Sequence, residues 1–356
     1  MSDVLGNILL YAPLGVAMAL CGWSRPRVLI GPLLLSASIE FAQTWIPGRD
    51  ASLGDVVANS LGAAAGFAVV RTSVHWLRPR GGLRVALAIA AALGALSVLA
   101  TTGILFQMDL PRSTYWGQWT PDLGYLQWYR GRVLQASLGP SDLPGGGPLA
   151  NSAEVRALLL ARAPLSIRAV AGPRVPALGS LFSIYDDRTR EIVLVGPDRD
   201  DLVLRYRTRA VVARLDHPDL RVEDALRGIA PGDRLDVVVR QGGKGYCVDV
   251  NGRSSCGVGL TVGRGWALLS YPEALPTWLR ILLDDAWVGC LLIPAGFWLT
   301  GRHGALVVFV LAAGLVVVPA LTGLIPTPPG EFVGAGAGVG LGVLIRRRVV
   351  AGGRKD

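Results

Sequence analysis

Polar side chains recur at helical spacing inside two apolar stretches near the start of the chain, and these residues are the best placed to do chemistry. Ser36, Glu40 and Gln43 stand at positions i, i+4 and i+7, so they share one helix face. Asp55 and Asn59 share a face of the next stretch. A carboxylate inside an apolar membrane helix is costly and usually marks function. The spacing therefore predicts a polar site between two helices.

Two further residues fall at the same predicted depth, near the outer boundary of a bilayer. The candidate intramembrane polar cluster comprises Asn7, Ser36, Glu40, Gln43, Arg49, Asp55 and Asn59. In an enzyme, Glu40 or Asp55 would act as general acid or base and Arg49 would hold a phosphate. The catalytic residues stay unassigned, because the cluster has no nucleophile–base pair, no nearby His and no metal-ligand spacing. The sequence predicts no metal and no cofactor.

Structural roles compete with this interpretation. Ser52 and Asp55 fit a capping box at the start of the second helix. Gly62 and Gly66 form a small-xxx-small seam, which more often serves packing than chemistry. Arg49 can simply rest among headgroups. Glu40 is the residue that packing alone explains least well.

The helices that would position these residues are membrane spans. The chain is 51% hydrophobic and 17% charged, and its mean hydropathy is +0.44, which excludes an ordinary soluble protein. Several runs approach or exceed the roughly 18 to 20 apolar residues that cross a bilayer. The seven predicted helices are Val4–Gly22, Val28–Ile46, Leu53–Val70, Leu83–Leu105, Trp278–Thr300, Ala305–Ile325 and Phe332–Ile345.

Basic residues gather in alternate loops, which predicts the orientation. They are Arg25, Arg27, Arg71, Arg78, Arg80, Arg84, Arg302, His303, Arg346, Arg347, Arg348, Arg354 and Lys355. By the positive-inside rule these loops are cytoplasmic, so the N-terminus and the central region lie outside and the C-terminus inside. This distribution accounts for much of the net charge of +9 and argues against nucleic acid as a partner. Met1–Gly22 lacks the basic start of a cleaved signal peptide.

The central region alternates apolar and polar residues between turn signals, which predicts an antiparallel β-sandwich. The predicted strands are Val133–Leu138, Ser166–Val170, Leu181–Tyr185, Glu191–Val195, Leu202–Thr208, Leu235–Arg240, Gly245–Val250, Ser254–Val262 and Ala267–Ser270, with a short helix at Ser152–Arg162. The aromatic run after the fourth helix, STYWGQWTPDLGYLQWYRGR, is interpreted as an interfacial belt. Acidic loops that include Asp186, Asp198 and Asp201 are solvated or bind calcium. Arg205, Arg207 and Arg209 form a solvated face or bind an anionic group.

Two cysteines flank an Asn-Gly pair in the run YCVDVNGRSSC. Asn-Gly is the strongest two-residue hairpin signal, and a turn centred there pairs Val250 with Arg253 and Cys247 with Cys256. Facing cysteines on neighbouring strands suit a disulfide, and a disulfide suits an extracytoplasmic domain. Two reduced, buried cysteines are the alternative.

These observations divide the chain into four parts. They are a membrane domain of about four helices (1–106), an extracytoplasmic β-sandwich (107–277), about three C-terminal membrane helices (278–346) and a basic cytoplasmic tail (347–356). The C-terminal helices echo the first: Cys290–Arg302 is similar to Ile8–Arg25, which predicts a degenerate parallel repeat of 1–70. The second copy is expected to lack counterparts of Glu40, Gln43, Asp55 and Asn59.

The opening stretch resembles the VanZ-like family. The resemblance rests on Asp3-Val-Leu-Gly-Asn7 and Pro13-Leu-Gly15, then Ser36, Glu40, Gln43, Arg49, Ser52, Asp55, Asn59 and Leu61-Gly62-Ala63, and ends at Gly66. Residues 107–277 resemble a concanavalin A-like (laminin-G-like, jelly-roll) sandwich through SLFSIYDD and LVLRYRT. The resemblance implies a multi-pass protein of the bacterial inner membrane, and founding members are linked to low-level teicoplanin resistance. It brings no established reaction.

Three hypotheses follow. The first is a non-enzymatic envelope protein whose polar cluster binds membrane lipids, through a headgroup, or a cell-wall intermediate, and whose sandwich recognises an envelope glycan or a partner. The second is an intramembrane enzyme acting on a lipid-linked sugar or phosphate. The third is a transporter of lipids or small molecules, which the repeat favours and the one-sided cluster disfavours. No motif specifies the ligand or the oligomeric state.

Overall fold

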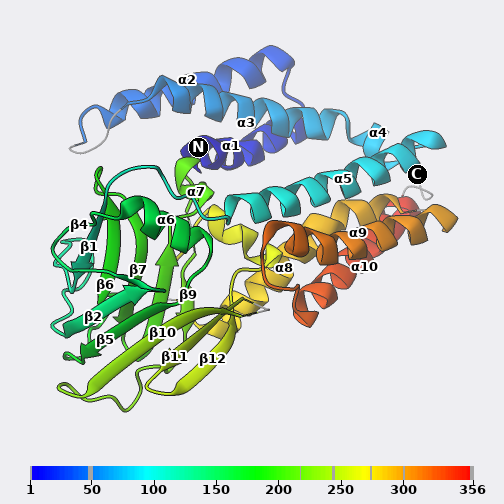
Figure 1. Ribbon diagram of the computed structural model, residues 1–356. Coiled ribbons are helices and arrows are strands. Elements are labelled where there is room, and N and C mark those ends of the chain that lie inside the picture. The colour runs from blue at the N-terminus through cyan, green and yellow to red at the C-terminus, as the bar shows by residue number, and fades with distance from the viewer. Residues whose placement is uncertain are drawn as a thin grey trace.

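The protein consists of two groups of helices and a β domain built from two sheets (Figure 1). The structure, a computed structural model, describes residues 2–46, 51–216, 218–242, 245–272, 275–299 and 301–352. In Figure 1 helices α1 to α4 lie above α5, α8, α9 and α10, and the sheets lie beside one end of both groups. The chain passes from helices to sheets and back to helices, as predicted.

The predicted helices are found close to their predicted positions. The N-terminal helices are α1 (Ser2–Leu20), α2 (Arg25–Gln43), α3 (Leu53–Arg71), α4 (Ser73–Leu77) and α5 (Gly82–Leu105). The C-terminal helices are α8 (Thr277–Trp298), α9 (Gly301–Thr322) and α10 (Pro329–Gly352). The short α4 was not predicted, and α10 is longer at both ends than the predicted Phe332–Ile345.

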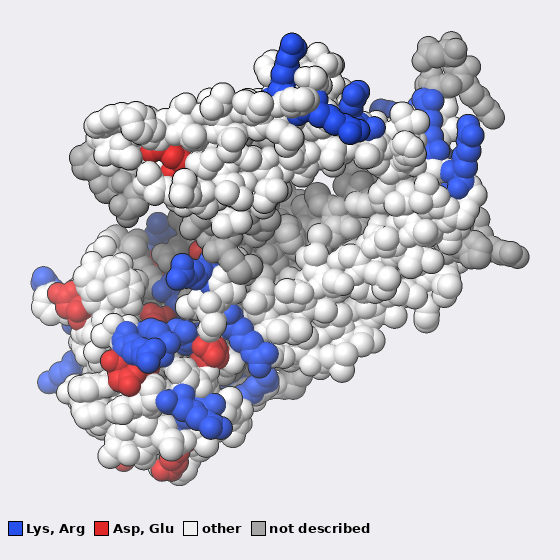
Figure 2. All heavy atoms as spheres, turned by 90° about the horizontal axis from the view of Figure 1, so that it is seen from above, with Lys and Arg blue, Asp and Glu red and all other residues white. Residues whose placement is uncertain are grey.

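Among the residues that the structure describes, four helical segments are long and apolar enough to cross a membrane. They are Leu53–Arg71, Gly82–Leu105, Thr277–Trp298 and Gly304–Thr322, and Gly6–Leu20 is a shorter apolar segment. Figure 2 shows an almost uncharged surface over the helices, between the charged β domain and a group of Lys and Arg residues at the far end. An uncharged band of this kind is what hydrocarbon requires. The chain therefore has the architecture of a membrane protein, while seven spans stay a prediction.

The β domain contains two antiparallel sheets of six strands each. Their orders are β4-β1-β6-β7-β8-β9 and β12-β11-β10-β5-β2-β3. The first sheet has β1 (Tyr115–Trp119), β4 (Gly147–Pro148), β6 (Phe182–Asp186), β7 (Glu191–Asp198), β8 (Asp201–Tyr206) and β9 (Leu220–Val222). The second has β2 (Arg132–Leu138), β3 (Ser141–Asp142), β5 (Leu165–Val170), β10 (Arg234–Gly242), β11 (Gly245–Val250) and β12 (Arg253–Val258).

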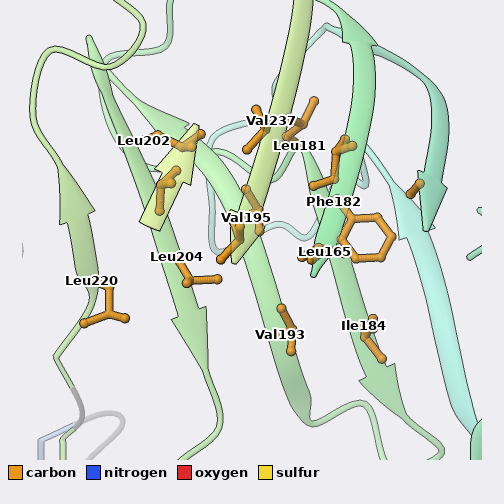
Figure 3. Close-up of a cluster of buried hydrophobic side chains, with 14 of the residues drawn as sticks. Leu165, Leu181, Phe182, Ile184, Val193, Val195, Leu202, Leu204, Leu220 and Val237 are labelled. Atoms are coloured by element: carbon orange, nitrogen blue, oxygen red, sulfur yellow. The ribbon is translucent and has the colours of Figure 1, made fainter. Parts of the chain in front are cut away.

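Inward-facing side chains from both sheets form one buried core. Phe182, Ile184 and Val195 come from the first sheet, and Leu165 and Val237 come from the second (Figure 3). Alternation along each strand sends every second side chain inward, which is why a period-2 pattern predicted these strands. The two-sheet antiparallel prediction is confirmed, whereas the jelly-roll topology stays a prediction. The short helix predicted at Ser152–Arg162 is α6 (Ser152–Leu160).

Three local predictions in this region are wrong. The predicted strand Ala267–Ser270 falls on η1, a 3-10 helix at Val262–Leu268, and β12 ends at Val258 instead of Val262. The aromatic run contains β1, and Tyr115 is fully buried in the core instead of lying in an interfacial belt. Aromatic residues suit both a membrane interface and a sheet, so composition alone did not separate the two environments.

The hairpin prediction is confirmed in its register. Val250 lies opposite Arg253, and Cys247 lies opposite Cys256. The turn residues Asn251 and Gly252 have φ angles of 50° and 82°, the left-handed conformation that a tight hairpin requires. Cys247 and Cys256 form a disulfide with their Cα atoms 3.9 Å apart.

Hydrogen bonds tie the helix ends together on the side away from the sheets. The Trp298 indole donates to the carbonyl oxygen of Trp76 at 2.6 Å, and Arg84 donates to the carbonyl oxygen of Trp298 at 3.3 Å. Arg346 donates to the carbonyl oxygen of Leu299 at 3.2 Å. These contacts join three of the basic loops predicted to be cytoplasmic. They group those loops on one side, and which side faces the cytoplasm stays a prediction.

Two helix pairs pack through glycine seams in the same register. A Cβ atom at Gly62 or Gly66 of α3 would overlap the carbonyl oxygens of Ile8 and Ala12 in α1, and one at Gly15 would overlap that of Ala63. Glycine allows this close backbone approach because it has no side chain. The packing interpretation of the Gly62 and Gly66 seam is therefore confirmed.

The same seam recurs between α8 and α10. A Cβ atom at Gly338 or Gly342 of α10 would overlap the carbonyl oxygens of Gly289 and Ile293 in α8, and one at Gly296 would overlap that of Val339. The three contacts match those of the α1–α3 pair. Each α8 residue lies the same number of positions after its counterpart in α1, and each α10 residue lies the same number of positions after its counterpart in α3. This register also aligns Pro13 with Pro294 and Asp55 with Glu331. The expectation that Asp55 has no counterpart is therefore wrong in this alignment, while the repeat itself stays a prediction.

Candidate functional site

Glu40 anchors the polar cluster between α2 and α3. Its side chain is 8% exposed, and its Oε2 accepts a hydrogen bond of 2.8 Å from the backbone N–H of Ser52. Ser52 is the N-cap of α3, and its Oγ accepts the N–H of Asp55 at 3.4 Å. The Glu40 carboxylate thus lies at the positive end of the α3 dipole, which stabilises a buried negative charge.

Ser36 and Asn59 form a second contact between the same two helices. The Asn59 Nδ2 donates to the Ser36 Oγ at 2.8 Å, and both side chains are buried. The Asn59 Oδ1 is buried without a hydrogen-bond partner among the described residues. Buried polar atoms without partners are uncommon in proteins, and one beside a buried carboxylate offers an acceptor to a donor group.

The other predicted residues lie around this core of the cluster. Asn7, Gln43 and Asp55 are half-buried on α1, α2 and α3, and their side chains make no hydrogen bond within the described ranges. Arg49 lies outside the described residues. The structure thus joins Glu40 to Ser52 and Ser36 to Asn59. The carboxylate of Asp55 has no partner in the part of the chain that the structure describes. The Ser52 half of the predicted capping box is present.

The described part of the cluster is rich in hydrogen-bond acceptors. Glu40 and Asp55 supply carboxylate oxygens, and Asn59 supplies an amide oxygen. Such a set suits ligands that donate hydrogen bonds, such as ammonium or sugar hydroxyl groups. In the described chain, no group of three or more His, Cys, Asp or Glu residues could hold a metal ion.

A second buried polar group lies at the start of α8 and α10, and sequence reasoning missed it. Asp284 is 6% exposed and accepts hydrogen bonds from Arg264 at 2.8 Å and from the Trp266 indole at 2.7 Å. Glu331 is 1% exposed, and its Oε2 accepts the Gly263 N–H at 3.1 Å. The signal was an adjacent pair of carboxylates, Asp284-Asp285, inside the apolar run TWLRILLDDAWVGC.

The sequence left two interpretations open for the acidic loops of the β domain and for its row of arginines. In the structure, residues of both groups form ion pairs. Arg221 lies 3.0 Å from Asp201 and 2.5 Å from Asp198, so a guanidinium group already contacts both carboxylates. Arg205 binds Asp219 through two hydrogen bonds, and Arg207 binds Asp109 at 2.8 Å. These contacts favour structural roles for the acidic loops and for two of the three arginines.

A cluster of this kind within apolar helices, joined to a two-sheet β domain, defines a membrane protein with a polar site near one end of its helices. Comparison with known families adds a more specific result. The family model described as VanZ/LLP1 matches residues 1–75, the segment that contains α1, α2 and α3 with the polar cluster. The match does not include the sheets, so their concanavalin A-like character stays a prediction. No curated protein and no solved structure matches the chain.

Proposed function

We propose that the protein is a non-enzymatic component of the bacterial envelope that binds a lipid headgroup or a lipid-linked cell-wall intermediate at the α2–α3 cluster. The buried Glu40 carboxylate is the observation that carries this proposal. Burying a charge is costly unless it is compensated, and the Ser52 N–H is the one hydrogen-bond partner of Glu40 among the described residues. A donor group from a ligand supplies the remaining compensation.

The position of the cluster supports a headgroup over an acyl chain as the ligand. Ser52 begins α3, so the cluster lies near a helix end instead of at the middle of a span. The half-buried Asp55 leaves a second carboxylate within reach of that end. We infer that the ligand contributes an ammonium or hydroxyl group, because the described cluster presents acceptors and no free cation.

Lipid co-purification tests the proposal. We expect mass spectrometry of the full chain to detect a specific lipid or lipid-linked sugar that is lost in Glu40→Gln. Glu154→Gln is the matched control, because Glu154 is an exposed carboxylate in α6. An unchanged lipid profile in folded Glu40→Gln protein would contradict the proposal.

The family match extends the proposal to glycopeptides. We propose that expression of the chain in a susceptible bacterium raises resistance to teicoplanin through the bound cell-wall intermediate. Glu40→Gln should then return the host to its original susceptibility at equal protein abundance. Resistance that survives this substitution would separate the phenotype from the cluster.

The matching glycine seams favour a transporter as the second candidate function. Two helix pairs in one register are the arrangement expected of transporter repeats. Reconstituted protein would then move a labelled lipid between bilayer leaflets, and Glu40→Gln would stop that movement. Binding without any movement favours the first candidate.

A further inference from the structure

A cleft lies where the β domain meets the ends of α5 and α9. Its volume is about 670 Å³. Phe106, Gln107 and Met108 follow α5, Tyr206 ends β8, and Pro319 and Ala320 belong to the last turns of α9, so one cleft joins the two parts of the molecule. It is separate from the α2–α3 cluster, with which it shares no residue.

The cleft carries positive charge that no described residue compensates. Arg162 and Arg209 line it and are both exposed, and the described lining residues include no Asp or Glu. Neither guanidinium group has a hydrogen-bond or ion-pair partner among the described residues. The neighbouring Arg205 and Arg207 are bound to Asp219 and Asp109. Within the described ranges, the arginines beside the cleft are thus paired with carboxylates, and those that line it are available.

Two tyrosines add neutral hydrogen-bond donors to this charge. The rings of Tyr206 and Tyr246 lie 6.1 Å apart, and both residues line the cleft. Burial raises the pKa of the Tyr206 hydroxyl and of the Tyr246 hydroxyl, and the nearby charge of Arg162 offsets part of that rise. Both hydroxyls therefore stay protonated at neutral pH and can donate to an anion.

The part of the cleft that α9 contributes is mostly apolar and continues onto the exposed apolar surface of that helix. Val316 lines the cleft and is 61% exposed, and Leu321, one turn along, is 78% exposed. The segment Gly304–Thr322 of α9 is a candidate membrane span. An acyl or prenyl chain held against this helix can therefore remain in hydrocarbon while its headgroup occupies the cleft.

We propose that this cleft binds the phosphate headgroup of an anionic membrane amphiphile, with Arg162 and Arg209 contacting the phosphate and the apolar chain lying along α9. Planar guanidinium groups match phosphate oxygens with short, charge-assisted hydrogen bonds. The α2–α3 cluster presents acceptors and this cleft presents donors, so the two sites select opposite chemical groups.

Binding to the full chain in detergent tests the assignment. The probes are dioctanoyl phosphatidylglycerol, dioctanoyl phosphatidylcholine, farnesyl monophosphate and inorganic phosphate. We expect the two anionic amphiphiles to bind at least about tenfold more tightly than phosphatidylcholine. Arg162→Gln and Arg209→Gln should each weaken that binding by about tenfold or more, because each removes hydrogen bonds to a charged group. Arg227→Gln, at an exposed arginine outside the cleft, is the matched control.

Two further arms keep the test decisive. Ala320→Trp should fill the cleft and abolish binding of the anionic amphiphiles while leaving the arginines in place. Equal affinity for phosphatidylglycerol and phosphatidylcholine, or unchanged affinity in the Arg162→Gln/Arg209→Gln double variant, would overturn the proposal. Inorganic phosphate that binds as tightly as phosphatidylglycerol would overturn the amphiphile as its source. Preference for farnesyl monophosphate over phosphatidylglycerol would support a prenyl carrier over a phospholipid.

Discussion

The helix pairs α1–α3 and α8–α10 share one packing solution but differ in what covers their polar ends. Glycines at matching positions bring the backbones of each pair together. In α8–α10, η1 returns from the β domain and binds Asp284 and Glu331 through Arg264, Trp266 and Gly263. In α1–α3, the equivalent Asp55 is half-buried, and its carboxylate has no hydrogen-bond partner among the described residues.

This difference shows that the packing of a helix pair and the chemistry at its end are determined by different residues. A glycine seam sets the distance between two helices, and this distance does not depend on the polar residues at the helix ends. What the ends can do depends on the segment that reaches them. In the α8–α10 pair, the β domain supplies an arginine and an indole that bind the buried carboxylate; we call this the closed pair. In the α1–α3 pair, the open pair, α2 supplies Glu40, so this end is rich in hydrogen-bond acceptors. This difference supports our proposal that the ligand binds at the end of the α1–α3 pair.

Asp284→Ala tests the closed pair most severely. It removes the acceptor of Arg264 and of the Trp266 indole and leaves a largely buried guanidinium group unpaired. We expect a loss of roughly 3–5 kcal/mol in the free energy of unfolding, measured by denaturation in detergent. The Arg264→Leu/Asp284→Leu double variant should recover part of the loss. A single variant as stable as the parent would show that η1 does not close this pair.

Loss of the disulfide should also affect the closed pair more than the open one. The hairpin pinned by Cys247 and Cys256 leads directly into η1. The two cysteines are 9 residues apart, so the cross-link contributes about 2–3 kcal/mol in the chain-entropy account. Cys247→Ser/Cys256→Ser should lower the unfolding temperature, and Cys290→Ser, at an exposed free cysteine, should not. Equal unfolding temperatures for the two variants would contradict this expectation.

The seams themselves can be compared by substitution. Gly338→Ala places a methyl group against the carbonyl oxygen of Gly289 and should cost about 1–3 kcal/mol. Gly340→Ala in the same helix meets open space and should be neutral or stabilising by up to ~1 kcal/mol, because alanine favours helix. Gly62→Ala should behave like Gly338→Ala in thermal unfolding. Opposite results for Gly62 and Gly338 would break the proposed equivalence of the pairs.

Glu40→Gln should have the smallest effect on stability. The glutamine amide oxygen can still accept the Ser52 N–H, so we expect a change below ~1 kcal/mol in the free energy of unfolding. Ligand binding should nevertheless be lost, because the negative charge is gone. A large loss of stability with unchanged lipid binding would assign Glu40 to the structure of the α3 N-terminus instead of to a site.

Much of this fold could be read from the sequence because it depends on local patterns. Long apolar runs predicted helices, and short runs between turn signals predicted strands. Asn251-Gly252 predicted a tight turn that set the pairing of Cys247 with Cys256. The polar residues of α2 and α3 were identified by helical spacing alone. Where one composition suits two environments, as around Tyr115, the prediction was wrong.

Contacts between distant segments were decided only by the tertiary structure. Spacing placed Glu40 on a helix face, but only packing brought it to the N–H of Ser52 and Asn59 to Ser36. The partners of Asp284 and Glu331 come from a 3-10 helix that the sequence pattern presented as part of a strand region. The cleft lined by Arg162 and Arg209 joins segments far apart in the chain. Sequence periodicity reports which face of an element is buried, and it carries no information on which distant element covers that face.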